Sequence, residues 1–70
     1  PFAGALQNLI AACSLKNDWD KVIEFSQLTA QQLQAEGKPF GQIYTLLSNA
    51  YEKKGDLDKT IEFYHKAAKQ

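Results

Sequence analysis

The segment Leu46–Ala68 reads LLSNAYEKKGDLDKTIEFYHKAA and contains two amphipathic helical patterns separated by Lys54, Gly55 and Asp56. Gly55 can adopt the left-handed backbone conformation that ends a helix, because it has no Cβ atom. Asp56 can cap the following helix, since its carboxylate can accept a free backbone N–H of the first turn. The segment therefore predicts a helix–turn–helix unit.

An internal repeat extends this unit over the rest of the chain. Shifting the sequence by 38 residues pairs identical residues along the whole overlap of the two halves. The pairs include Pro1/Pro39, Phe2/Phe40, Leu9/Leu47, Ala12/Ala50, Asp18/Asp56, Asp20/Asp58, Lys21/Lys59, Ile23/Ile61, Glu24/Glu62, Phe25/Phe63, Ala30/Ala68 and Gln32/Gln70. We predict a single domain of residues 1–70, with a first repeat at 1–38 and a second at 39–70 that stops while still helical. A repeat boundary at residue 1 favours a processed product or an excised piece of a longer array.

Apolar residues recur at helical spacing in four segments. The expected helices are 1–15, 19–36, one that begins at Pro39, and one from Leu57 to about Lys69, with turns near residues 17–18, 37–38 and 55–56. Their predicted inner faces are Leu6, Leu9, Ile10 and Cys13; Trp19, Val22, Ile23, Ala30 and Leu33; Phe40, Ile43, Tyr44, Leu47, Ala50 and Tyr51; and Leu57, Ile61, Tyr64 and Ala68. The predicted fold class is all-α, with two helix–turn–helix repeats stacked as a short α-solenoid.

The residue order of the second repeat resembles the tetratricopeptide repeat family. The residues that carry the resemblance are Leu47, Ser48, Asn49, Ala50, Tyr51, Gly55, Asp56, Ile61, Tyr64 and Ala67. The first repeat departs from the pattern at Ile10, Cys13 and Thr29. The period of 38 residues exceeds the usual 34 by about one helical turn, which fits a long-helix variant. The alternative is a generic pair of helical hairpins.

In tetratricopeptide arrays the first helix of each repeat lines a groove that binds a partner peptide or helix. Carried over to this sequence, the resemblance implies a groove lined by Gly4, Gln7, Ala11, Ser14, Gln42, Thr45, Asn49 and Glu52, with Lys53 at its edge. The alternative is that these residues are simply the polar outer face of two amphipathic helices. Chaperone-binding members hold a C-terminal carboxylate with a clamp of Lys and Asn. Here Gln7, Ala11 and Thr45 replace clamp residues, so that ligand class is disfavoured.

Composition excludes several other classes. Eight basic and eight acidic residues give no net charge, whereas a nucleic-acid footprint needs clustered positive charge. No apolar run reaches the 18 residues expected of a membrane span. His65, the sole histidine, is expected on the surface, and Cys13 is expected to be a small apolar residue within its stripe. One Cys and one His do not make a zinc site. We therefore expect no catalytic residue, no metal and no cofactor.

Three function classes follow from these observations. The leading one is an intracellular, cytoplasmic scaffold that binds a protein or peptide partner. The second is a self-association module, with a homodimer through the last helix as one possible form. The third, a pentatricopeptide-like RNA binder, is disfavoured by the zero net charge.

Overall fold

Three residues with a positive φ angle separate the helices of the chain: Asn17 (61°), Gly37 (70°) and Gly55 (85°). The computed structural model describes residues 2–69, and within that range it contains no strand. The helices are α1 (Phe2–Leu15), α2 (Trp19–Ala35), α3 (Gly41–Lys54) and α4 (Leu57–Ala68). The predicted all-α class and the three predicted turns are confirmed.

The first and third turns have the same construction, 38 residues apart. Asn17 and Asp18 donate their backbone N–H groups to Ser14 and Cys13 at 3.0 and 2.9 Å. Gly55 and Asp56 donate in the same way to Glu52 and Tyr51, again at 3.0 and 2.9 Å. These paired bonds satisfy carbonyl groups that the end of a helix would leave without partners. The internal repeat of the sequence is therefore a repeat of structure.

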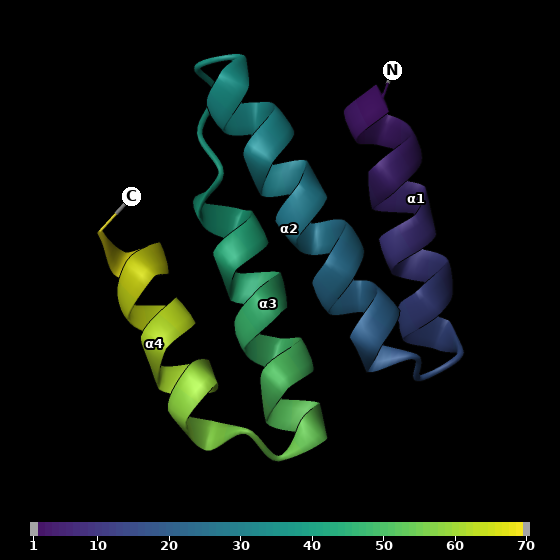
Figure 1. The fold of residues 1–70 in the computed structure, drawn as a ribbon, viewed down its shortest axis with the longest axis vertical. Coiled ribbons are helices and arrows are strands. Elements are labelled where there is room, and N and C mark those ends of the chain that lie inside the picture. Colours follow the sequence, from purple (N-terminus) through teal and green to yellow (C-terminus); the bar gives the residue numbers. More distant parts are fainter. Residues whose placement is uncertain (1, 70) are drawn as a thin grey trace.

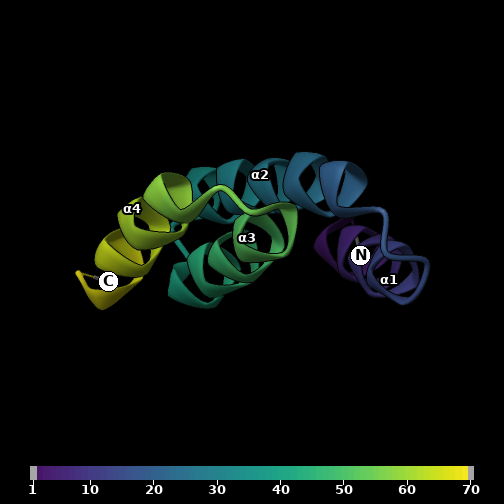
Figure 2. The ribbon, with the colours of Figure 1, turned by 90° about the horizontal axis from the view of Figure 1, so that it is seen from below.

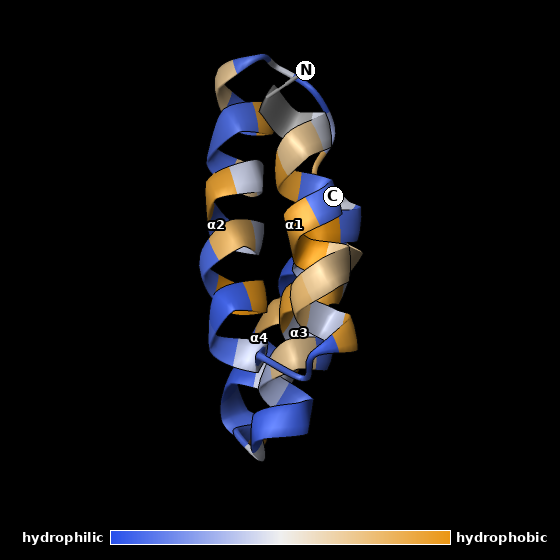
Figure 3. Ribbon diagram, turned by 90° about the vertical axis from the view of Figure 1, so that its right-hand side faces the viewer, coloured by the Kyte–Doolittle hydropathy of each residue, from blue (hydrophilic) through white to orange (hydrophobic). Residues whose placement is uncertain are grey.

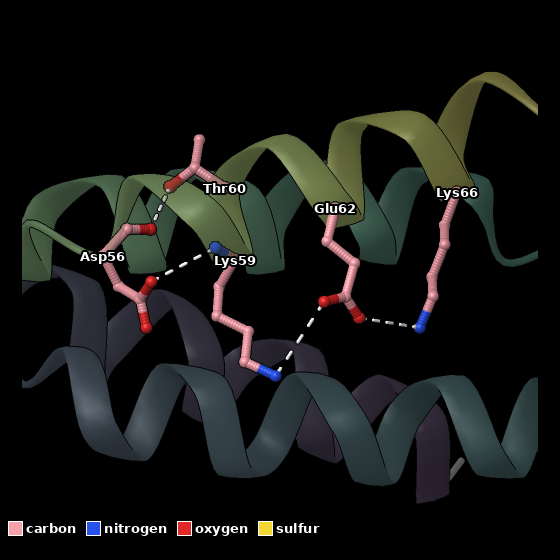
Figure 4. Close-up of polar contacts among 5 residues, drawn as sticks. All are labelled: Asp56, Lys59, Thr60, Glu62 and Lys66. Carbon is pink, nitrogen blue, oxygen red and sulfur yellow. Dashed lines mark hydrogen bonds and ion pairs between the residues drawn. The ribbon is translucent and has the colours of Figure 1, made fainter.

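Two aspartates cap the second helix of each pair. The Lys21 N–H donates to Asp18 Oδ1 at 3.3 Å, and the Lys59 N–H donates to Asp56 Oδ1 at 3.1 Å. Figure 4 shows the second cap, beside the Thr60 hydroxyl, which donates to the Asp56 carbonyl at 2.8 Å. The ion pairs that follow along α4 are half exposed and contribute little stability.

Replacing Gly55 by alanine tests the left-handed turn. The φ of 85° is unfavourable for a residue with a Cβ atom, so Gly55→Ala should lower the free energy of unfolding by about 1–2 kcal/mol. Gly4, in the first turns of α1, is the matched control, because a Cβ there meets no atom within 4 Å. Gly4→Ala should leave stability unchanged or raise it by up to about 1 kcal/mol. Urea unfolding measures both changes, and equal effects at the two glycines would contradict this description of the turn.

The predicted start of the third helix at Pro39 is wrong. Phe40 is the residue that precedes α3, with φ −136° and ψ 22°, and the helix begins at Gly41. The Phe40 ring packs edge-on against the Tyr44 ring, with 5.4 Å between centroids. This packing accounts for the non-helical backbone at Phe40. At the other ends, α2 and α4 each stop one residue before the predicted end, and the predicted helical residue Pro1 lies outside the described range.

The helices run alternately up and down, and each packs on the next (Figure 1). The resulting body measures 31 × 29 × 12 Å between Cα atoms, so it is a single curved layer of helices. Its core has two adjoining clusters. One is built around Ala30, Ile43, Leu47 and Phe63, and the other around Ile10, Val22 and Ala50.

The predicted inner face of α4 is wrong by one helical position. Thr60 and Phe63 are the buried residues of this helix, and Ala67 is half-buried. The predicted stripe of Leu57, Ile61, Tyr64 and Ala68 is exposed. Leu9 of α1 is likewise exposed, although the sequence placed it on an inner face. Both deviations occur on the outer helices, which have a neighbour on one side only within the described residues.

Candidate functional site

A hollow of about 420 Å³ lies between α1 and α3. Both helices sit on the same side of α2, as Figure 2 shows, so their polar faces flank a shared groove. We call it the α1–α3 groove. Its lining residues are Gln7, Ile10, Ala11, Ser14, Gln42, Ile43, Thr45 and Leu46.

Five of the residues assigned to a groove from the sequence line this hollow. They are Gln7, Ala11, Ser14, Gln42 and Thr45. The structure brings them together although they belong to different repeats. The other assigned residues, Gly4, Asn49, Glu52 and Lys53, are exposed but do not line it. The three on α3 lie beyond Thr45, toward the C-terminal end of that helix.

The polar groups of the α1–α3 groove are uncharged. Gln7 and Gln42 can each donate and accept hydrogen bonds through their side-chain amides. The Ser14 hydroxyl donates to the Ile10 carbonyl at 2.9 Å, which leaves its oxygen able to accept a further bond. The groove therefore offers hydrogen-bonding groups of both kinds without fixing the sign of a ligand's charge.

Ile10, Ile43 and Leu46 complete the lining, and sequence reasoning did not assign them to a groove. Ile10 and Ile43 are buried members of the two core clusters, so they form the apolar part of the groove where it meets the core. Their helical stripes were visible in the sequence, but a stripe does not reveal where the core surfaces between two helices. Leu46 follows the polar Thr45 and is partly exposed.

A second hollow, of about 360 Å³, lies along α2 and α4 with α3 between them. Its lining is Gln27, Ala30, Gln31, Gln34, Tyr44, Leu47, Phe63 and Lys66. The Lys66 ammonium lies 4.8 Å from the centre of the Phe63 ring and 3.3 Å from a Glu62 carboxylate oxygen. Its charge is thus already paired within α4. Nothing in the sequence analysis had pointed to this hollow.

The residues weighed for chemistry occupy unremarkable positions. His65 is exposed and Cys13 is half-buried against the second core cluster. Among residues 2–69, no group of three or more His, Cys, Asp or Glu side chains is placed to hold a metal ion. Within the same range, no helix has both the length and the apolar character needed to cross a membrane.

Comparisons with models of protein families, with curated proteins and with solved structures find no match to this chain. The argument for function therefore depends on the geometry of the groove.

Proposed function

We propose that this chain is a tetratricopeptide-like scaffold, which binds a short segment of a partner protein in the α1–α3 groove. One observation carries the proposal. Five residues that the resemblance assigns to a groove, from two repeats, line the same hollow of about 420 Å³. The α-solenoid arrangement accounts for this, because the first helices of both repeats lie on one side of α2.

The chemistry of the groove favours an extended segment over a helix. A helix satisfies most of its backbone hydrogen bonds internally, whereas an extended segment exposes N–H and C=O groups along its length. The amides of Gln7 and Gln42 can bond both kinds of group. Ile10, Ile43 and Leu46 offer apolar contact to small side chains of the segment.

The same lining disfavours ligands that depend on charge. No Lys, Arg, Asp or Glu lines the α1–α3 groove among the described residues. A terminal carboxylate would find no cation there, in agreement with the absence of the Lys-and-Asn clamp from the sequence. The partner segment is therefore an internal, weakly charged stretch of chain.

Selection from a phage-displayed library of random peptides on the immobilised 70-residue chain tests this function. We expect uncharged sequences to be enriched. Ala11→Arg places a long cation in the groove and should weaken binding of a selected peptide by at least about tenfold, or about 1.4 kcal/mol. Ala35→Arg is the matched control, because Ala35 is exposed at the end of α2 and outside the groove.

Circular dichroism establishes that both variants keep their helices. If the selection enriches no peptide, or if Ala11→Arg and Ala35→Arg bind the selected peptide equally well, the α1–α3 groove is not the binding site.

A further inference from the structure

The outer face of α4 is an exposed apolar stripe. Leu57, Ile61 and Tyr64 are 62%, 67% and 46% exposed, and Ala68 continues the stripe. On α2, the residues 38 positions earlier are Trp19, Ile23, Ser26 and Ala30. There, Ser26 and Ala30 are buried and the other two are half-buried, because α3 packs over this side of α2. The α4 stripe is thus the counterpart of a surface that is covered elsewhere in the same molecule.

The outer face of α1 shows the reciprocal feature. The residues of α3 that pack into the core beside α2 include Ile43, Leu47 and Ala50, which are at most 4% exposed. Their counterparts on α1 are Ala5, Leu9 and Ala12, which are all exposed. Figure 3, which looks onto the α1 side, colours much of that helix as hydrophobic. The molecule therefore carries both halves of the α2–α3 contact a second time, on opposite sides.

The charged contact beside the α2–α3 packing is also duplicated. The Lys54 ammonium of α3 donates a hydrogen bond to the Asp20 carboxylate of α2, and this raises the pKa of Lys54. The corresponding residues are Lys16, directly after α1, and Asp58 on α4. Both are exposed, and within the described residues neither takes part in an ion pair. A cation thus accompanies the α1 face, and an anion accompanies the α4 face.

We infer that a second copy of this chain packs its α1 face, formed by Ala5, Leu9, Ala12 and Lys16, against the α4 face. The intermolecular contact reproduces the internal α2–α3 contact, with Lys16 of one copy beside Asp58 of the other. A copy of the same chain is the occupant because the chain itself carries both complementary faces, with matching register and opposite charge.

The exchange of residue sizes is compatible with this packing. The stripe of α4 has the larger Tyr64 where α2 has Ser26, and the stripe of α1 has the smaller Ala5 where α3 has Ile43. Bulk is therefore moved from one side of the contact to the other. Because the two faces differ, each added copy leaves one α1 face and one α4 face open, and association continues head to tail.

Two blocked variants test the inference by analytical ultracentrifugation. Leu9→Glu places a charge on the α1 face, and Ile61→Glu places one on the α4 face. Both positions are exposed, so we expect unchanged circular dichroism and melting at low concentration. The unmodified chain should show a mass that rises with concentration above the monomer mass of 7.8 kDa. Each variant alone should associate at least about tenfold more weakly.

An equimolar mixture of the two variants gives the decisive result. It retains one intact α1 face and one intact α4 face, so it should form a dimer of twice the monomer mass and nothing larger. A symmetric dimer through α4 would instead be unaffected by Leu9→Glu. The inference is overturned by that result, by a mixture that stays monomeric, or by an unmodified chain that remains at 7.8 kDa up to about 1 mM. In the last case the two faces belong to other partners.

Discussion

Phe63→Ala should lower the free energy of unfolding by about 3–5 kcal/mol, the usual loss for a buried phenylalanine. The Phe63 side chain is 8% exposed in the first core cluster. Its ring stacks on Tyr51 at 5.5 Å between centroids and contacts Tyr44 at 5.8 Å. A domain of this length has a total stability of only about 4–10 kcal/mol, so the variant should be largely unfolded at physiological temperature.

Ile61→Ala is the control for Phe63, because it removes an apolar side chain from the opposite side of the same helix. Ile61 is exposed, and its loss should cost no more than about 0.5 kcal/mol when unfolding is measured on dilute protein. Urea titration followed by circular dichroism gives both values. A larger loss at Ile61 than at Phe63 would mean that α4 packs with the face predicted from the sequence.

The second large effect is expected at Leu47. This residue is 1% exposed at the centre of the first core cluster, between α2 and α4. Leu47→Ala should cost about 2–5 kcal/mol, since it removes buried methyl groups and leaves a cavity. The preceding residue provides a control of identical chemistry. Leu46 is partly exposed at the α1–α3 groove, and Leu46→Ala should cost less than about 1 kcal/mol.

Thermal melting of the two variants side by side checks the helical phase of α3. With a stability change of 1 kcal/mol shifting the midpoint by about 4–8 °C in a domain of this size, the two variants should be well separated. Midpoints that coincide would contradict the burial assigned to Leu47.

The turns and helices could be predicted because their determinants are local. Gly55 and Asp56 specify a helix end and a cap by their own chemistry, and Asp18 does the same in the first repeat. Asn17 adopts the left-handed conformation that the sequence had explained only for glycine, and asparagine is one of the few other residues that tolerate it.

The phase of α4 could not be predicted in the same way. Two faces of this helix carry apolar side chains, and the stripe of Leu57, Ile61 and Tyr64 is the more apolar of the two. Which face is buried depends on where α3 lies, and α3 covers the side of Phe63. A stripe that is built for a neighbour outside this fold looks, in sequence, like an inner face.

The candidate groove was predictable in part for a related reason. Helical spacing placed Gln7, Ala11 and Thr45 on outward faces, and the repeat register related them to one another. The relative position of α1 and α3 decides how far along those faces the hollow extends. It includes Thr45 but ends before Asn49, a limit that no single helix encodes.

Backbone amide chemical-shift mapping tests the central claim, peptide binding in the α1–α3 groove, most directly. The 70-residue chain, labelled with nitrogen-15, is titrated with a peptide selected on it. We expect the largest shift changes at Gln7, Ala11, Ser14, Gln42 and Thr45, on two helices that are not neighbours in sequence. Changes concentrated instead at Gln27, Gln31 and Lys66, around the second hollow, would contradict the assignment of the α1–α3 groove as the binding site.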